Sequence, residues 1–234
     1  MTRTFIAIEG LDGAGKSTQI KLLTELYSAM EIPTKFVHFP RNEEGVFGKL
    51  ISGFLRGDYG DVKQVHPQLV ALLFAEDRKD FASTLQQWLD EGNVVLVDRY
   101  VLSNIAFQCA KTYGKDEKEA LRKWIYHFEY EYNKIPKPDL SIYLDVPFSF
   151  THSSLNEKRE GDERTYLQGK DDIHEKDMDL QIAVREEYLE LANDPDVVTS
   201  IKCYDTHGAM FSVETIHQQI LACIDERINH TITK

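Results

Sequence analysis

The feature that most constrains the fold of this chain is the octapeptide Gly10-Leu11-Asp12-Gly13-Ala14-Gly15-Lys16-Ser17. It follows a β-rich apolar run, Thr4–Glu9, and leads into Lys16–Met30, where apolar residues recur at helical spacing. Glycines let such a loop turn tightly and aim its N–H groups inward, and the helix adds the positive end of its dipole. The octapeptide therefore predicts a strand–loop–helix unit that binds the phosphates of a nucleoside triphosphate.

Within this loop, Lys16 is expected to reach the β- and γ-phosphates, and the Ser17 hydroxyl to ligate Mg²⁺. A second apolar run, Asn93–Asp98, ends in a carboxylate and has the pattern of a strand buried on both faces of a parallel sheet. Ligands of open α/β sheets bind at the carboxyl ends of the strands, so Asp98 is predicted to hold the water shell of the magnesium ion. The residues expected to contact ATP are Gly10, Gly13, Ala14, Gly15, Lys16, Ser17 and Thr18.

Strand and helix patterns alternate along the chain, which is typical of a parallel sheet with helices on both faces. Strands are expected at Thr4–Glu9, Thr34–Phe39, Asn93–Asp98, Leu140–Val146 and Val197–Tyr204, and helices at Lys16–Met30, Val46–Leu55, His66–Glu91 and Ser212–Ile228. The segment Lys111–Lys134 suggests an additional surface helix. We predict one domain over residues 1–234, a doubly wound five-stranded parallel sheet flanked by helices, of the P-loop NTPase type.

One segment, Asn156–Asp179, breaks this pattern because it is highly charged and poor in apolar residues. Most charge runs are solvated loops. Its place between the fourth and fifth strands favours a second interpretation, a mobile charged lid at about residues 153–179 that closes over a nucleotide.

Composition narrows the possible partners and the location. The 234 residues carry a formal net charge of −12, which argues against a polynucleotide partner because phosphate backbones require clustered Lys and Arg. No apolar run approaches the roughly 20 residues that span a bilayer, and the N-terminus passes into a strand pattern without a signal peptide. The three cysteines show no CxxC spacing, so free thiols in the cytoplasm are expected.

Several short stretches resemble the thymidylate kinase family, whose members transfer a phosphoryl group from ATP to dTMP. They are Phe39-Pro40-Arg41, Leu73-Phe74-Ala75-Glu76-Asp77-Arg78, Asp98-Arg99-Tyr100, the SxxAFQ stretch Ser103–Gln108, and KPDLSIYLDVP at residues 137–147. The resemblance extends from Phe5 to the last helix pattern. It implies that Asp12 holds the 3′-hydroxyl of the acceptor, that Arg99 contacts phosphates, that Asp205 lies near the adenine, and that the protein is a homodimer.

The same stretches form a plausible monophosphate site. Arg41 and Arg78 can neutralise an acceptor phosphate through bidentate guanidinium contacts, Phe74 offers a flat face to a pyrimidine, and Gln108 can bond a base edge. The expected substrate-binding residues are Asp12, Phe39, Arg41, Phe74, Arg78, Arg99, Tyr100, Ser103, Phe107, Gln108 and Tyr166.

Transfer of a phosphoryl group requires cations that stabilise its transition state. Some members of the family carry a basic residue inside the phosphate loop, where this chain has Gly13. We therefore expect the lid to supply the charge, through Arg159 or Arg164. The predicted catalytic residues are Asp12, Lys16, Arg99, Arg159 and Arg164.

Two other interpretations stay open on sequence grounds. The chain could be another P-loop kinase that acts on a deoxynucleoside or on a different monophosphate. It could also be a regulatory nucleotide-binding switch, although Asn133-Lys134-Ile135-Pro136 lacks the Asp that a guanine-recognition element requires.

Overall fold

The protein is described from a computed structural model, which covers residues 3–61, 64–151 and 166–228. Five parallel strands form one sheet in the order β2-β3-β1-β4-β5. Their bounds are β1 Thr4–Glu9, β2 Thr34–His38, β3 Val94–Asp98, β4 Leu140–Asp145 and β5 Thr199–Lys202. The predicted five-stranded parallel sheet is confirmed.

The strands at the centre of the sheet are buried on both faces, as their continuous apolar runs predict. Every residue of β1 is buried, and β1 pairs with β3 so that Ile8 lies opposite Asp98. This register brings the loop after β1 and the carboxylate that ends β3 to the same edge of the sheet. The edge is therefore the part of the fold that positions the site.

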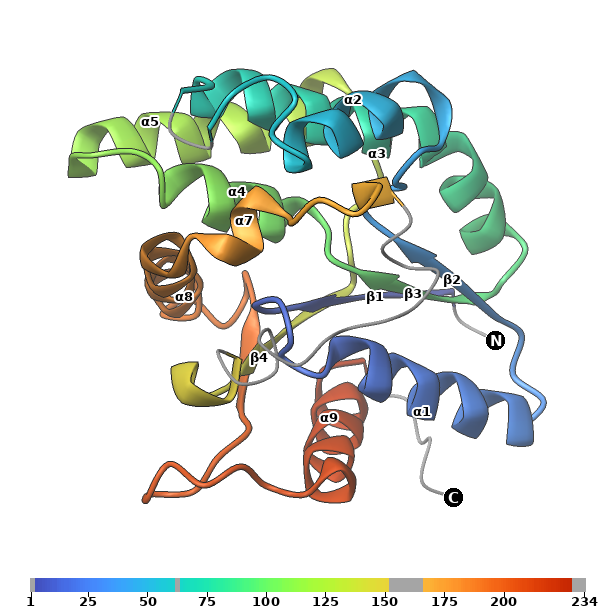
Figure 1. Cartoon of the computed structure of the whole chain (residues 1–234). Coiled ribbons are helices and arrows are strands. Elements are labelled where there is room, and N and C mark those ends of the chain that lie inside the picture. The colour runs from blue at the N-terminus through green and yellow to red at the C-terminus, as the bar shows by residue number, and fades with distance from the viewer. Residues whose placement is uncertain (1–2, 62–63, 152–165, 229–234) are drawn as a thin grey trace.

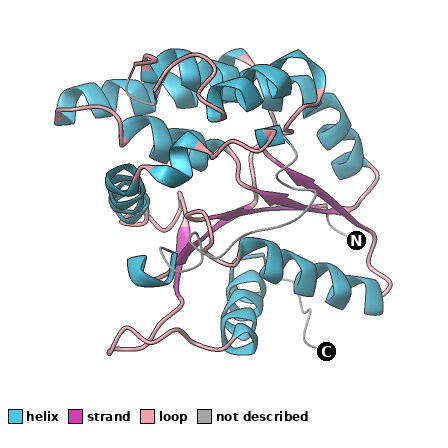
Figure 2. Ribbon diagram, in the orientation of Figure 1, coloured by secondary structure: helices cyan, strands magenta, loops and turns pink. Residues whose placement is uncertain are grey.

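Helices cover both faces of the sheet (Figures 1 and 2). On one face lie α2, α3, α4 and α5, with α7 and α8 beside them, and on the other lie α1 and α9. Their bounds are α1 Lys16–Ala29, α2 Gly45–Leu55, α3 Pro67–Asp90, α4 Val101–Cys109, α5 Lys115–Tyr126, α7 Ile173–Lys176, α8 Met178–Leu191 and α9 Val213–Ile228. Two hydrophobic cores, one on each face, follow from this layering.

The expected surface helix in Lys111–Lys134 is present as α5, and it continues into a π-helical turn, η1, at His127–Tyr132. The backbone N–H of Asn133 donates to the carbonyl of Phe128, 2.9 Å away, which is the i→i+5 spacing of a π-helix. Helix α4, over the SxxAFQ stretch, and helix α8 were not among the expected elements.

The described part of the predicted lid, residues 166–179, differs from a solvated charged loop. Leu167, Asp172 and His174 are buried, and Asp172 caps α7 by accepting a hydrogen bond from the His174 N–H at 2.7 Å. Asp177 caps α8 in the same way at the N–H of Leu180. This stretch packs against the body of the protein because its few apolar and aromatic side chains find partners there. Residues 153–165 of the predicted lid lie outside the described residues.

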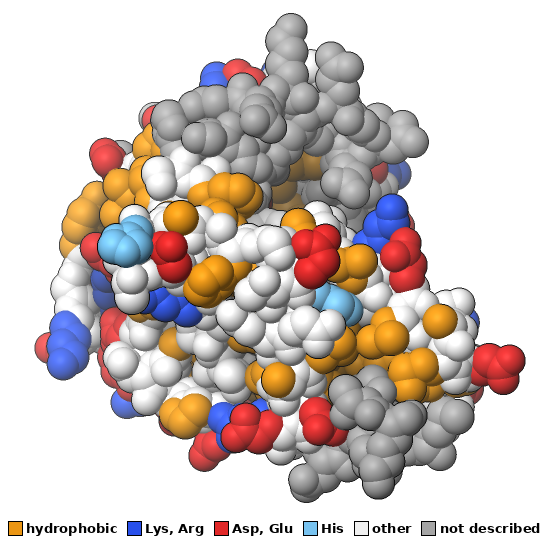
Figure 3. Space-filling model, turned by 90° about the horizontal axis from the view of Figure 1, so that it is seen from below, with side chains coloured by type: hydrophobic (Ala, Val, Ile, Leu, Met, Phe, Trp, Pro, Cys, Tyr) orange, Lys and Arg blue, Asp and Glu red, His pale blue; other side chains and the backbone are white. Residues whose placement is uncertain are grey.

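None of the described helices combines the length and the apolar composition that crossing a membrane requires. On the face of the molecule shown in Figure 3, the described Lys and Arg side chains are scattered and do not form one basic patch.

Candidate functional site

The phosphate loop lies between β1 and α1, and its backbone geometry depends on glycine at two positions. Gly13 and Gly15 have φ of 77° and 82°, which is the left-handed region that favours glycine. Gly15 is also the N-cap of α1, so the first N–H groups of that helix, which have no intrahelical acceptors, face the loop. Ser17 and Thr18 are exposed there. The loop is thus arranged to bind an anion at a helix N-terminus.

Lys16 is the cation of this loop, and its side chain is buried. Its Nζ donates to the carbonyl oxygen of Leu11 at 2.9 Å and lies 3.9 Å from a carboxylate oxygen of Asp98. Burial, together with the nearby Arg99 guanidinium, lowers the pKa of Lys16 to about 8. A phosphate that enters the loop therefore meets a buried cation whose ion pair with Asp98 is long, at 3.9 Å.

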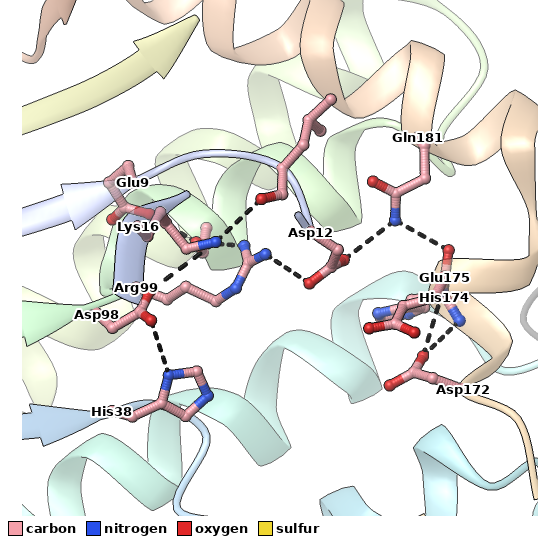
Figure 4. Close-up of polar contacts among 12 residues, drawn as sticks. Glu9, Asp12, Lys16, His38, Asp98, Arg99, Asp172, His174, Glu175 and Gln181 are labelled. Carbon is pink, nitrogen blue, oxygen red and sulfur yellow. Dashed lines mark hydrogen bonds and ion pairs between the residues drawn. The ribbon is translucent and has the colours of Figure 1, made fainter. Parts of the chain in front are cut away.

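Asp98 stands beside Lys16 at the end of β3 (Figure 4). Its Oδ2 lies 3.3 Å from Nδ1 of His38, and its buried Oδ1 has no hydrogen-bond partner among the described residues. Burial alone would raise the pKa of this carboxyl, but Lys16 and His38 outweigh it and lower the pKa to about 2. Asp98 is thus an ionised carboxylate, and its Oδ1 makes no hydrogen bond to the described residues but lies 3.9 Å from Nζ of Lys16.

An ion pair between Asp12 and Arg99 joins the loop to a second pocket. Nη2 of Arg99 donates to Oδ1 of Asp12 at 2.8 Å, and Nη1 donates to Oγ of Ser103 at 3.2 Å. Arg99 has φ of 63°, an unusual conformation for a residue with a side chain, and such conformations concentrate at functional sites. Oδ2 of Asp12 accepts from Nε2 of Gln181, 3.1 Å away on α8. Burial would raise the pKa of Asp12, but Arg99 and Lys16 hold it well below its usual range.

Behind this ion pair, Glu9 organises the wall between the two sites. It is fully buried at the end of β1, and its carboxylate accepts from Ser103 Oγ at 2.5 Å, from the Tyr188 hydroxyl at 3.0 Å and from the Tyr100 N–H at 3.0 Å. Burial raises the pKa of Glu9. Because Ser103 also receives a hydrogen bond from Arg99, Glu9 orients Arg99 indirectly.

The second pocket lies between β2, α3, α4 and the segment 166–175. Phe74 and Phe39 contribute aromatic surface, and Arg78 and Asn104 contribute polar groups. All but one of the expected substrate residues line it: Asp12, Phe39, Phe74, Arg78, Arg99, Tyr100, Ser103, Phe107, Gln108 and Tyr166. The structure brings these residues together, and their contacts with a substrate stay a prediction.

Arg41 is the expected substrate residue that does not line the pocket. Its guanidinium contacts Oδ1 of Asp77, 3.0 Å from Nε, and Oδ2 of Asp80, 2.7 Å from Nη2. Arg78 lines the pocket, but Nε and Nη2 of its guanidinium donate to the carboxylate of Glu129, with Nε at 2.8 Å. Both cations are therefore already balanced by carboxylates, which weakens their predicted role in binding an acceptor phosphate.

One wall of the pocket comes from residues that the sequence did not single out. The imidazole of His174 stacks on Phe107, with ring centroids 5.1 Å apart, and its Nε2 lies 3.0 Å from Nζ of Lys111. The same Nζ donates to Oε1 of Gln108 at 2.9 Å, so a base contact by Gln108 would use its Nε2. Burial lowers the pKa of Lys111 to about 7. Burial also lowers the pKa of His174, and the nearby charge of Lys111 lowers it further.

The remaining expected residues lie apart from this pocket. Asp205 accepts hydrogen bonds from the N–H groups of His207 and Ala209 at 2.8 and 2.9 Å, and so it stabilises its own turn. This turn precedes α9, whose start is tied to α1 by a hydrogen bond from Nε2 of Gln19 to the Val213 carbonyl at 3.0 Å. Arg159 and Arg164 lie outside the described residues.

A phosphate loop that shares an ion pair with a second, aromatic-walled pocket defines a nucleotide-dependent kinase of the P-loop type. A family model described as thymidylate kinase matches residues 8–220. The chain therefore belongs to the thymidylate kinase family.

Individual relatives agree with this assignment. A probable thymidylate kinase of Pyrococcus abyssi is 31% identical over 226 residues, which cover 96% of this chain and 97% of the relative. The thymidylate kinase of Mycobacterium tuberculosis is 32% identical over 187 residues, covering 80% of this chain and 85% of the relative. The solved structure of thymidylate kinase from Candida albicans matches with a TM-score of 0.68 at 27% identity, covering 97% of this chain and 94% of that one.

Proposed function

We propose that the chain transfers the γ-phosphoryl group of ATP to dTMP, giving dTDP and ADP. The phosphate loop is the donor site, and the pocket behind Asp12 and Arg99 is the acceptor site. The observation that carries this proposal is the ion pair itself. Because Asp12 and Arg99 border both sites, a phosphate in the loop and a nucleotide in the pocket meet at one point.

In this proposal, the loop residues Gly10, Gly13, Ala14, Gly15, Lys16, Ser17 and Thr18 bind ATP. The N–H groups at the start of α1 receive phosphate oxygens, and Lys16 exchanges its contact with the Leu11 carbonyl for the β- and γ-phosphates. Asp205 and its turn lie beside the adenine. Holding donor and acceptor phosphates in line is most of what a protein contributes to phosphoryl transfer.

The described residues also fit a magnesium ion at the donor site. Mg²⁺ is typically held by one or two protein oxygens, several waters and the substrate phosphates. Asp98 supplies an ionised carboxylate with a buried oxygen that makes no hydrogen bond to the described residues, and Ser17 supplies an exposed hydroxyl at the start of α1. When bound, the ion would neutralise charge that develops on the phosphates.

At the acceptor site, the ionised Asp12 accepts a hydrogen bond from the sugar hydroxyl, while Arg99 contacts the phosphates and carries a permanent positive charge. The aromatic side chains Phe39, Phe74, Tyr100 and Phe107 enclose the nucleoside. Ser103 acts through Arg99, since its hydroxyl is engaged by Glu9 and Tyr188.

The proposal is tested by measuring ADP release from ATP and Mg²⁺ with a panel of acceptors, namely dTMP, dUMP, dCMP, dGMP and thymidine. We expect turnover that is highest with dTMP. Turnover only with thymidine would make the chain a nucleoside kinase, and no turnover with any acceptor would indicate a nucleotide-binding protein without kinase activity. The discrimination between dTMP and dUMP depends on one methyl group and is expected to be modest, about 10- to 200-fold.

The charge balance of the pocket supports a catalytic role for Arg159 or Arg164. In the described part of the pocket, Arg78 and Arg99 each face a carboxylate, so further positive charge has to come from elsewhere when ATP and a monophosphate meet. We expect Arg159→Ala or Arg164→Ala to lower kcat by at least ~10²-fold with a modest change in KM. Steady-state kinetics of both variants measures this, and kcat near the wild-type value in both would exclude a catalytic role for these arginines.

We further propose a homodimeric, cytoplasmic enzyme formed by one kinase domain. Family membership favours the dimer, as do exposed apolar residues on neighbouring helices, Val46 on α2 and Leu69 on α3, with exposed fractions of 70% and 59%. Three buried free thiols, at Cys109, Cys203 and Cys223, fit a reducing compartment.

A further inference from the structure

Helix α8 contacts the carboxyl edge of the sheet through three polar side chains, Gln181, Arg185 and Tyr188. They follow one another at helical spacing, which places them on one side of the helix. Nε2 of Gln181 donates to Oδ2 of Asp12 (Figure 4), and the Tyr188 hydroxyl donates to Glu9. Arg185 lies between them and contacts another part of the same edge, and the proposed mechanism gives it no role.

Arg185 joins the helix to the ends of two strands. Its Nη2 donates to Oδ1 of Asp145 at 2.6 Å, at the end of β4, and to the Tyr204 hydroxyl at 3.2 Å, just after β5. Its Nε donates to the carbonyl of Val146 at 3.3 Å. The Tyr204 hydroxyl itself donates to Oδ2 of Asp145 at 3.1 Å. Guanidinium, carboxylate and phenol therefore form a closed ring of charge-assisted hydrogen bonds, which fixes α8 relative to both strand ends.

Tyr204 connects this ring to the turn that is proposed to lie beside the adenine. Asp205 follows Tyr204 directly, and its N–H donates to the carbonyl of Ala209 at 3.0 Å. Tyr204 also pairs with Met210 in an isolated antiparallel bridge, which closes the turn. The base of the turn is thus held by a backbone bridge and by the side-chain hydroxyl of Tyr204. A change in the position of this turn therefore changes the contacts of Arg185.

One helical turn before Arg185, the same helix is fixed to the acceptor side. Gln181 is fully buried, and its Nε2 donates to Asp12 at 3.1 Å and to the carbonyl of His174 at 3.0 Å. Both partners are acceptors, so the amide cannot be turned round without losing both bonds. A rigid helix can carry a displacement from one of its contacts to the next. The position of α8 therefore bears on how Asp12 faces the acceptor.

We propose that Arg185 is a positioning residue that couples the two nucleotides: it ties α8, and through Gln181 also Asp12, to the turn beside the adenine. A donor nucleotide that orders this turn then also orders Asp12, so each nucleotide raises the affinity for the other. The acceptor pocket, as the described residues outline it, does not include Arg185. The inference rests on the proposed function, because it assumes that ATP and dTMP occupy the two sites.

The test measures the Kd of dTMP by calorimetry, with and without a saturating β,γ-imido analogue of ATP and Mg²⁺. In the wild type we expect the analogue to lower this Kd at least about fivefold, and dTMP to lower the Kd of the analogue by the same factor. In Arg185→Met we expect the factor to fall to about two or less, while the Kd of each nucleotide alone changes less than about threefold. Independent binding of the two nucleotides by the wild type would overturn the inference and leave the proposed function standing.

Arg122→Met is the matched control, because Arg122 also holds α8 but away from the edge of the site. Its Nη2 lies 3.3 Å from Glu187 and 3.2 Å from Glu190, both on α8. Its side chain is 16% exposed, against 24% for Arg185. We expect a lower Tm with the wild-type coupling factor. An equal loss of coupling in Arg122→Met would mean that any loosening of α8 causes it, and would overturn the inference.

Tyr204→Phe covers the case in which Arg185→Met does not fold. It removes one hydroxyl from the ring and leaves the ion pair between Arg185 and Asp145 in place. The turn then loses its side-chain tie to α8 while the helix stays attached to β4, so the coupling factor should fall in this variant too.

The wild-type coupling factor in a folded Arg185→Met or Tyr204→Phe variant would overturn the inference while the wild type still phosphorylates dTMP. Absence of dTMP binding and turnover in the wild type is a separate result, which would overturn the proposed function first and this inference with it.

Discussion

Replacement of Lys16 by Met is expected to lower kcat by about 10³-fold. Nζ of Lys16 is the cation nearest the centre of the phosphate loop, and donors or cations aimed at a developing charge in a shielded site are each worth factors of about 10² to 10³. Met keeps much of the apolar stem of Lys16, so the loop should keep its shape. Steady-state kinetics with ATP and dTMP measures the loss, and thermal unfolding shows whether the variant is folded.

The same residue gives the wild-type enzyme an alkaline limit. Burial lowers the pKa of Lys16 to about 8 in the free protein, below the usual value of a lysine, so its positive charge is lost as the pH rises through that value. Because kcat/KM reports the free enzyme, we expect kcat/KM to fall above about pH 8. Bound phosphates favour the charged form, and kcat should therefore fall only at higher pH.

Lys16→Arg is the control for this assignment. A guanidinium stays protonated throughout the assay range, so the alkaline fall of kcat/KM should disappear even if the absolute rate is reduced. An unchanged alkaline fall in Lys16→Arg would assign it to another group. A kcat of Lys16→Met within tenfold of the wild type would show that the loop backbone binds the phosphates without this side chain.

The fold was largely predictable from the sequence because its strongest signals are local. Apolar runs such as Asn93–Asp98 report burial within a few residues, and the strand–loop–helix pattern around Gly13 and Gly15 locates the phosphate loop. Helix α8 was missed although Leu180, Val184, Tyr188 and Leu191 recur at helical spacing after the capping Asp177. The charged stretch before it hid this pattern. The sequence therefore does carry the signal for this helix.

The acceptor pocket was only partly predictable, because its second layer of contacts is made across long sequence distances. Gln181 reaches Asp12 over 169 positions, and Glu129 reaches Arg78 over 51. No local pattern tells a buried Glu in a π-helical turn from a solvated one in a charged helix. Arg78 was predicted to bind the acceptor phosphate for this reason. The sequence does not show that Glu129 already balances its charge.

Replacement of Arg99 by Met is the second large effect that we expect, with kcat/KM lower by about 10³-fold at neutral pH. Arg99 donates to Asp12 and to Ser103, so the variant loses a cation between donor and acceptor phosphates and also frees Asp12. The loss should appear in both kcat and KM, because the proposed function has the guanidinium contact phosphate groups in the ground state and in the transition state.

The pH dependence of the Arg99→Met variant distinguishes this account from a loss of structure. In the wild type, burial would raise the pKa of Asp12. Arg99 makes the largest of the contributions that lower this pKa, and together they keep the carboxylate ionised throughout the assay range. Without Arg99 the pKa of Asp12 rises, and activity is lost as the pH falls through the new value. We therefore expect kcat/KM of Arg99→Met to gain an acid limb that the wild type lacks. Arg99→Lys keeps a positive charge beside Asp12 and should show no such limb, whereas a flat acid profile in a folded Arg99→Met would mean that Asp12 takes no part in acceptor binding in its ionised form.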